Sequence, residues 1–318
     1  MSTAAAAKVD VPLAYDQRSD AAAGEVLRRL LGVITQNLEG AVSGEDPEHL
    51  HQLRIAVRRS RTVQRQLKGA FPSLQLPGFR SEFRWLQRAT GEARDLDVYV
   101  LEFESLRQLV PLPLRPDLDP LVPVLAHWRL AARAESARSL GSRRFIELVA
   151  DWDQLLESLV ECPLDDRPIA KQPIGPVVGK RIQKVYERVR TMGAMIDENS
   201  AAEDFHELRK KGKELRYLLE LFGTRLFDEQ VTSPLVKTLK GLQDVLGRHQ
   251  DREVQIAMLR SLVDEVATAP GGPRACMAMG VLVDRLQADE AGARREFAER
   301  FAPLAQEFQS ALVSETFV

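Results

Sequence analysis

The chain has 318 residues, of which 28% are charged and 6% aromatic, and its 44 Lys and Arg residues nearly balance 46 Asp and Glu residues. This length allows one large or two medium domains, and the composition is typical of a globular helical protein, not of a disordered or β-rich one. A signal peptide, a membrane span of roughly 20 apolar residues and a disulfide or zinc framework are all missing, since the only cysteines are Cys162 and Cys276. We therefore expect a cytoplasmic protein without a membrane partner or a cofactor.

Helices are predicted along nearly the whole chain, because apolar residues recur at spacings of three and four residues. Residues 1–19 read as a flexible N-terminal tail. Segments rich in proline or glycine interrupt the helices at residues 71–78, 111–123, 162–176 and 270–273. The third interruption lies nearest the middle of the chain. It predicts a first helical half at residues 20–162, a linker at residues 163–176 and a second helical half at residues 177–312.

The segment HQLRIAVRRSR, residues 51–61, begins the most unbalanced part of the sequence, with six basic residues and no acidic one from Arg54 to Lys68. On a helix, the histidine and four of these arginines fall within an arc of roughly 80°. The opposite side is small or apolar and suits a bundle core. This first stripe consists of His51, Arg54, Arg58, Arg61 and Arg65.

A second stripe follows at an offset of 155 residues, in HELRKKGKELR, residues 206–216. It consists of His206, Arg209, Lys213 and Arg216. With one residue inserted, the register continues, because Leu86, Gln87, Gly91 and Asp95 match Leu242, Gln243, Gly247 and Asp251. The pattern indicates an internal duplication. We therefore predict an all-α fold of two four-helix bundles related by a pseudo-two-fold axis.

A charged helix face is usually solvated surface, but such faces mix signs, because like charges three or four residues apart destabilise a helix. The same one-sign pattern occurs at matching positions in both halves, which favours a shared site for a polyanion such as a phosphate chain. Further cations that we expect to extend the site, on weaker grounds, are Arg143, Arg144, Lys180, Arg181 and Lys184.

Three alternatives stay open at this point. Nucleic acid also carries phosphates, although the exposed aromatic residues typical of single-strand binders and the motifs of duplex readers are not evident. The pairs Glu48/His51 and Glu203/His206 have the spacing of di-metal carboxylate enzymes, but the neighbouring arginines disfavour metal ions there. The acids Asp95 and Asp251 more simply cap or pair with the basic helices. Phosphate-loop and nucleophile-elbow motifs are absent from the sequence.

The two segments HQLRIAVRRSRTVQRQL and HELRKKGKELRYLLELF are each followed by L-Q-x(3)-G-x(3)-D with an acid two residues further on. Together they resemble the two halves of the CHAD (conserved histidine α-helical domain) family, over roughly residues 20–312. The resemblance implies one compact domain that binds inorganic polyphosphate in a basic groove or pore, at polyphosphate granules. The stripe residues would bind the ligand, with His51 and His206 as the family's histidines. Because the segment lacks the alternating glutamates of a triphosphate-processing CYTH domain, we expect a stand-alone binding module without catalytic activity. Gly212, which occupies the position of Val57, departs from the repeat.

Overall fold

The structure is a computed structural model that describes residues 3–317, apart from the side chain of Phe308. The first half contains α1 (Ser19–Gln36), α2 (Leu38–Ser43), α3 (Pro47–Gln66), η1 (Lys68–Ala70), α4 (Leu76–Ala89), α5 (Gly91–Arg107), η2 (Leu112–Leu118), α6 (Leu121–Leu140) and α7 (Arg143–Ser158). The second half contains α8 (Ile174–Gly193), α9 (Ala202–Leu218), η3 (Leu219–Gly223), α10 (Thr224–Leu226), α11 (Glu229–Ser261), α12 (Val263–Thr268), α13 (Gly272–Ala305) and α14 (Glu307–Thr316). The predicted all-α class is confirmed. None of the helices in the described range is long and apolar enough to cross a membrane.

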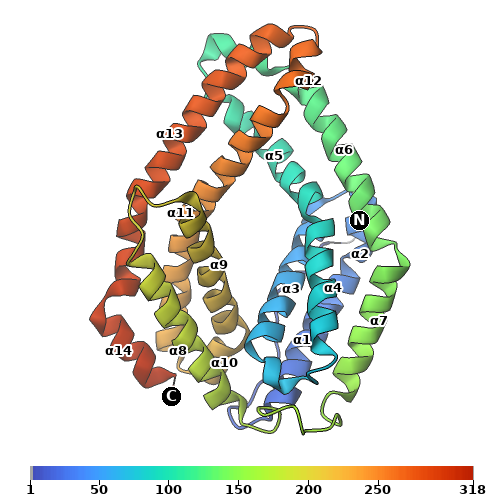
Figure 1. Ribbon diagram of the computed structural model, residues 1–318, viewed down its shortest axis with the longest axis vertical. Helices are drawn as coiled ribbons and strands as arrows, with labels where there is room; N and C mark the ends of the chain where they lie inside the picture. The colour runs from blue at the N-terminus through green and yellow to red at the C-terminus, as the bar shows by residue number, and fades with distance from the viewer. Residues whose placement is uncertain (1–2, 318) are drawn as a thin grey trace.

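The main helices follow the same order in both halves, although the second half has fewer breaks. The first half interrupts its long helical path between α4 and α5 and again between α6 and α7, whereas α11 and α13 run for 33 and 34 residues. Figure 1 shows the first half, in blue to green, beside the second, in yellow to red. The halves meet at both ends of the molecule, through α3 and α9 at one end and through α6, η2, α12 and α13 at the other.

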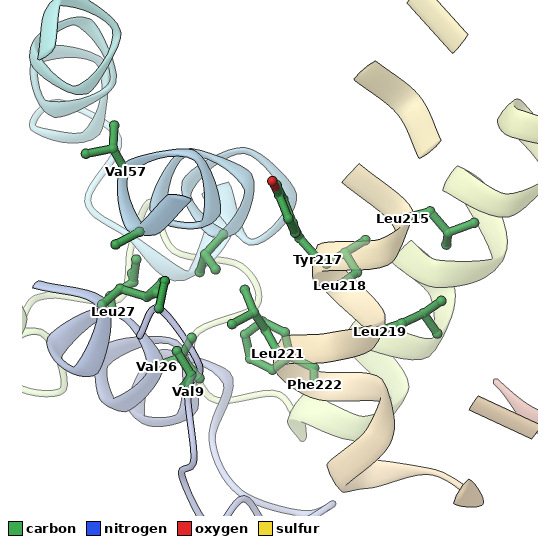
Figure 2. Packing of buried hydrophobic residues seen from close by; sticks show 14 of the residues in the cluster. Val9, Val26, Leu27, Val57, Leu215, Tyr217, Leu218, Leu219, Leu221 and Phe222 are labelled. Atoms are coloured by element: carbon green, nitrogen blue, oxygen red, sulfur yellow. The ribbon is translucent and has the colours of Figure 1, made fainter. Parts of the chain in front are cut away.

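Both hydrophobic clusters in the described part of the molecule draw on both halves. The larger cluster joins α1 and α3 to α8, α9 and η3, and Figure 2 shows Val26 and Leu27 on one side of this core with Leu221 and Phe222 facing them from the other. The smaller cluster joins Tyr99 and Leu125 to Leu259 and Leu282 at the other end. Burial of apolar surface therefore stabilises the relative placement of the two halves.

The N-terminal segment corrects one expectation, because residues 3–18 pack against the bundle and do not form a loose tail. Ala7 and Val9 are each only 3% exposed. The backbone N–H of Ala7 donates to Gln52 Oε1 at 2.8 Å, and Arg225 donates to the carbonyl of Val9 at 3.0 Å. The segment thus contacts α3 of the first half and α10 of the second.

The linker between α7 and α8 is also anchored, through an arginine that sequence patterns do not single out. Arg167 is fully buried and forms an ion pair with the fully buried Asp20 of α1 at 2.9 Å. Its guanidinium also donates to the carbonyl oxygens of Ala70 and Cys162. A buried charge requires such pairing, since its desolvation is costly. The linker is therefore held firmly against the first half.

Candidate anion-binding site

The first stripe lies on α3, whose start is defined by its capping residues. Asp46 accepts a hydrogen bond from the Glu48 backbone N–H at 2.8 Å, and Pro47 occupies the first helical position. The face opposite the stripe is buried, with Leu53 and Ala56 completely inaccessible. Packing of that face turns the stripe toward the second half of the molecule.

Arg54 is the most buried member of the stripe and anchors α3 to the next helix. Its Nη1 donates to the Gln87 carbonyl at 2.8 Å and to Thr90 Oγ1 at 2.7 Å. Burial and the nearby Arg58 lower its pKa to about 10, so it stays charged at neutral pH. A Cβ atom at Gly91 would lie 3.9 Å from this guanidinium, and a side chain longer than that of alanine at this position would occupy the space of the guanidinium.

Arg209 occupies the matching place on α9. A Cβ atom at Gly247 would lie 3.7 Å from Arg209 Nη2, so Gly247 lies beside Arg209 in the way that Gly91 lies beside Arg54. Arg209 also pairs with Asp251 of α11 at 3.6 Å, in line with the pairing role expected for that acid. The glycines of the two L-Q-x(3)-G-x(3)-D motifs thus leave room for one guanidinium in each half.

The two stripes meet at Arg58. Burial lowers the pKa of both Arg209 and Lys213 in the second half, and Arg58 of the first half lowers both further, because like charges that lie close together disfavour the charged form. Burial is the largest influence on Lys213 and, with Arg209 and Arg58, lowers its pKa to about 7. The structure therefore brings Arg54, Arg58, Arg209 and Lys213 into one cluster, which we call the central cluster.

Donors in and beside this cluster lack partners. The Nε atoms of Arg54, Arg58, Arg209 and Arg216 are shielded from solvent, and none has a hydrogen-bond partner among residues 3–317. Buried donors without partners are costly, and in native proteins they call for an explanation. Several arginine Nε donors without partners in one place are what a site for anionic oxygen atoms would present.

Two acids from opposite halves lie beside the central cluster. Asp95 lies on α5 of the first half and Asp251 on α11 of the second. Burial is the main cause that raises the pKa of Asp95, and the nearby Asp251 raises it further, so the two acids are neighbours. The Asp251 side chain is nevertheless 53% exposed. Burial raises the pKa of Asp251 as well. Asp95 and Asp251 are both exposed, so the place where the two halves face each other beside the central cluster is open to a ligand from solution.

The remaining stripe residues differ in whether they form ion pairs with acids of the protein. Arg61 forms no ion pair with an acid of the described chain, whereas Arg65 pairs with the buried Glu214 of α9 at 2.8 Å. Arg216 lies 3.5 Å from Glu220 and also over the ring of Tyr217. Arg65 therefore helps to join the two halves, whereas Arg216 is paired within the second half, and less of the charge of both is available to a ligand.

The two histidines lie at the starts of the stripes. Burial, Arg94 and the neighbouring arginines lower the pKa of His51, and its Nδ1 is buried without a partner among the described side chains and backbone. His206 Nδ1 is hydrogen-bonded to Gln250 of α11. The Glu-x-x-His pairs do not assemble into a metal centre in the described part of the chain, where no group of three or more potential ligands comes together.

The additional cations expected from the sequence lie elsewhere, which corrects that expectation. Arg143 pairs with Glu147 on its own helix, and Arg144 pairs with Glu82 at 2.6 Å and stacks on Trp85. Both belong to α7. Lys180, Arg181 and Lys184 lie on α8, and they are not among the charges that perturb the central cluster. A basic pair near the start of a helix therefore does not indicate whether its side chains face the central cluster.

Other cations, which the sequence analysis did not select, lie beside the first stripe. Burial lowers the pKa of Arg61, and so do Arg65, Arg84 and Arg80. Arg94 of α5 similarly perturbs His51 and Arg54. Arg80 and Arg84 are four residues apart and so share one face of α4, a signal that the sequence does contain. What it lacks is the register that places this face against α3.

Gly212 has a structural explanation. Helix α9 continues through it without a break, and a Cβ atom there would lie 3.7 Å from Gln243 Nε2 of α11. A Cβ atom would thus make an ordinary van der Waals contact with α11, and the glycine does not interrupt the helix.

Comparison with known proteins agrees with this architecture. The CHAD domain family model matches residues 25–260. The crystal structure of the CHAD domain from the plant Ricinus communis superposes with a TM-score of 0.74 and 24% identity, covering 93% of this chain and 95% of that one. PptA from Streptomyces chartreusis superposes with a TM-score of 0.67 and 17% identity, covering 90% and 99%.

Curated relatives include the uncharacterized proteins MT2285 and Rv2226 of Mycobacterium tuberculosis. Each is 23% identical over 228 residues, or 67% of this chain. The chain spans 40% of the length of these relatives.

Proposed function

Because this chain belongs to the CHAD domain family, we propose that it binds inorganic polyphosphate between its two halves. The ligand oxygens would contact Arg54, Arg58, Arg209 and Lys213, with His51, His206, Arg61 and Arg216 at the margins. The observation that carries the proposal is the meeting of two cationic stripes from different halves at Arg58, with buried Nε donors that lack protein partners. A chain of phosphates would supply both the negative charge and the acceptors.

The electrostatic cost of the free protein supports the same conclusion. Burial and, after it, the like charges of Arg209 and Arg58 lower the pKa of Lys213 to about 7, and Asp251 compensates only in part. A polyanion would relieve this repulsion, and the release of its counterions would add to the affinity. Planar Arg and compact Lys donors suit a repetitive phosphate chain, whose oxygens offer acceptors without a fixed sequence.

We assign the protein a binding role and not a catalytic one. The central cluster consists of cations, with the carboxylates of Asp95 and Asp251 beside it, a composition that suits the binding of an anion. In a cell we place the protein in the cytoplasm, on polyphosphate granules, because multivalent attachment would follow from a site that recognises charge along a chain.

Titration at moderate salt with long-chain polyphosphate, single-stranded DNA and orthophosphate in parallel tests the proposal. We expect polyphosphate to bind far more tightly than either competitor, and its affinity to fall steeply as salt is raised. Equal affinity for DNA would show instead a general phosphodiester binder. No binding of polyphosphate would refute the proposal outright.

A further inference from the structure

The two halves differ in the charges that lie beyond the central cluster. Helices α3 and α4 are consecutive and antiparallel, and the bonds from Arg54 to Gln87 and Thr90 define their register. Arg61 follows Arg54 by seven residues, or about 10 Å along α3, and therefore lies level with the start of α4. Arg80 and Arg84 lie on this part of α4, so arginines of two adjacent helices stand side by side.

These arginines are not neutralised by the protein. Within the described residues, Arg58, Arg61, Arg80 and Arg84 form no ion pair with any acid, whereas the nearby Arg65 is paired with Glu214. The acid of α4, Glu82, lies on the opposite face of that helix and pairs with Arg144. Arg84 is exposed and Arg80 half-buried, so both are open to a ligand.

The second half lacks this feature at the matched positions. Arg216, which matches Arg61, lies 3.5 Å from Glu220, and Glu220 itself occupies the position of Arg65. In the repeat, Arg80 is matched by the uncharged Val236, and Arg84 is matched by Lys240, which keeps the positive charge. The cationic surface therefore continues beyond the central cluster on one side only.

We propose that Arg61, Arg80 and Arg84 form a one-sided extension of the anion-binding site, along which a bound polyphosphate chain leaves the central cluster over α3 and α4. This inference rests on the proposed function and deepens it. Short chains fill the central cluster alone, whereas long chains also reach the extension. The three arginines thus set a preference for chain length, and they give the bound chain a defined side of exit.

The test compares Arg80→Gln/Arg84→Gln with Lys180→Gln/Lys184→Gln, a control that removes two charges from exposed positions on α8. Tripolyphosphate and long-chain polyphosphate are titrated against both variants and the wild type. For the α4 variant we expect long-chain affinity to fall about tenfold and tripolyphosphate affinity to change less than about twofold. The slope of long-chain affinity against salt concentration should decrease by the amount that corresponds to about two lost phosphate contacts. The α8 variant should match the wild type with both ligands.

Two results would overturn the extension. Equal losses for tripolyphosphate and long chains would place Arg80 and Arg84 within the central cluster. Equal long-chain losses in the α4 and α8 variants would mean that only overall charge matters. Retained tripolyphosphate binding also reports that the α4 variant is folded. Failure of the wild type to bind either ligand would refute the proposed function itself, a result distinct from the other two.

Discussion

Arg58 of α3 and Lys213 of α9 come from opposite halves of the chain, yet Arg58 contributes to lowering the pKa of Lys213 to about 7. Two cations meet here because the hydrophobic faces behind them, with Leu53 on α3 and Leu215 on α9, are completely buried. Apolar packing thus holds together charges that would otherwise separate. The electrostatic cost is a property of the free protein that a polyanion would remove.

Polyphosphate binding should be coupled to protonation of Lys213. In the free protein this amine loses its proton near pH 7, and a bound polyanion raises its pKa, so binding takes up a proton above pH 7. Affinity should therefore fall as pH rises from 7 toward 9. Calorimetry at pH 8 in buffers of different ionisation enthalpy measures the proton uptake. Lys213→Arg keeps the charge and should reduce the uptake; unchanged uptake would exclude Lys213 as its source.

Arg58→Gln should stabilise the free protein while weakening polyphosphate binding. Arg58 opposes the charges of Arg54, Arg209 and Lys213, and its own Nε has no partner in the described chain. Its removal should raise the free energy of unfolding by up to about 1 kcal/mol, as often happens when a functional site is relaxed. Denaturant unfolding and a polyphosphate titration measure the two effects.

The neighbouring residue provides the control for Arg58. Arg59 forms an ion pair with Glu220 and donates to the Ala7 carbonyl, so Arg59→Gln should lower stability. If both variants lost stability, mutual repulsion in the central cluster would not be the dominant effect at Arg58.

Arg167→Ala should destabilise the whole fold. Its partner Asp20 would be left as a buried charge, and breaking such a pair typically costs about 3–5 kcal/mol. Arg18→Ala is the matched control, because Arg18 pairs with the same carboxylate but is 37% exposed, and exposed ion pairs contribute little to stability. Urea unfolding distinguishes them. Equal losses in the two variants would show that the linker is not anchored through Arg167.

The junction between the halves should weaken in acid. Burial raises the pKa of Glu214, but Arg65 and Lys211 outweigh it and hold that pKa below its usual range. A depressed carboxyl pKa contributes stability that is present above the unfolded value of about 4.3 and is lost as the pH falls through the folded value. Unfolding at pH 7 and pH 3 should therefore differ less in Glu214→Gln than in the wild type. An unchanged difference would contradict this role.

The stripes were predictable from the sequence because helical periodicity is a local property. The positions of Arg54 and Arg209 on one face of their helices follow from residue spacing alone, and the repeat indicated that the two helices belong together. Arg80 and Arg84 also share a helix face, but their place beside Arg61 depends on the antiparallel register of α3 and α4. That register arises from side-chain packing between helices, which no local pattern carries.

Anchoring of the tail and of the linker was missed for the same reason. Val9 is apolar but isolated, and only its burial between the two halves reveals a role. Arg167 looks like an ordinary loop cation, since its partner Asp20 lies 147 residues earlier in the chain. Arg144 illustrates the opposite error, because a basic pair in the sequence indicated a ligand site whereas the folded chain pairs it with Glu82.

The affinity for long-chain polyphosphate of Arg58→Glu/Lys213→Glu, compared with that of Lys180→Glu/Lys184→Glu, tests the central claim most directly. Both variants make the same change in formal net charge, but only the first alters the place where the two stripes meet. We expect the first to lose at least about a hundredfold in affinity, given the worth of several charge-assisted contacts, and the second to lose less than about threefold. Similar losses in the two variants, or undiminished binding in the first, would contradict the account.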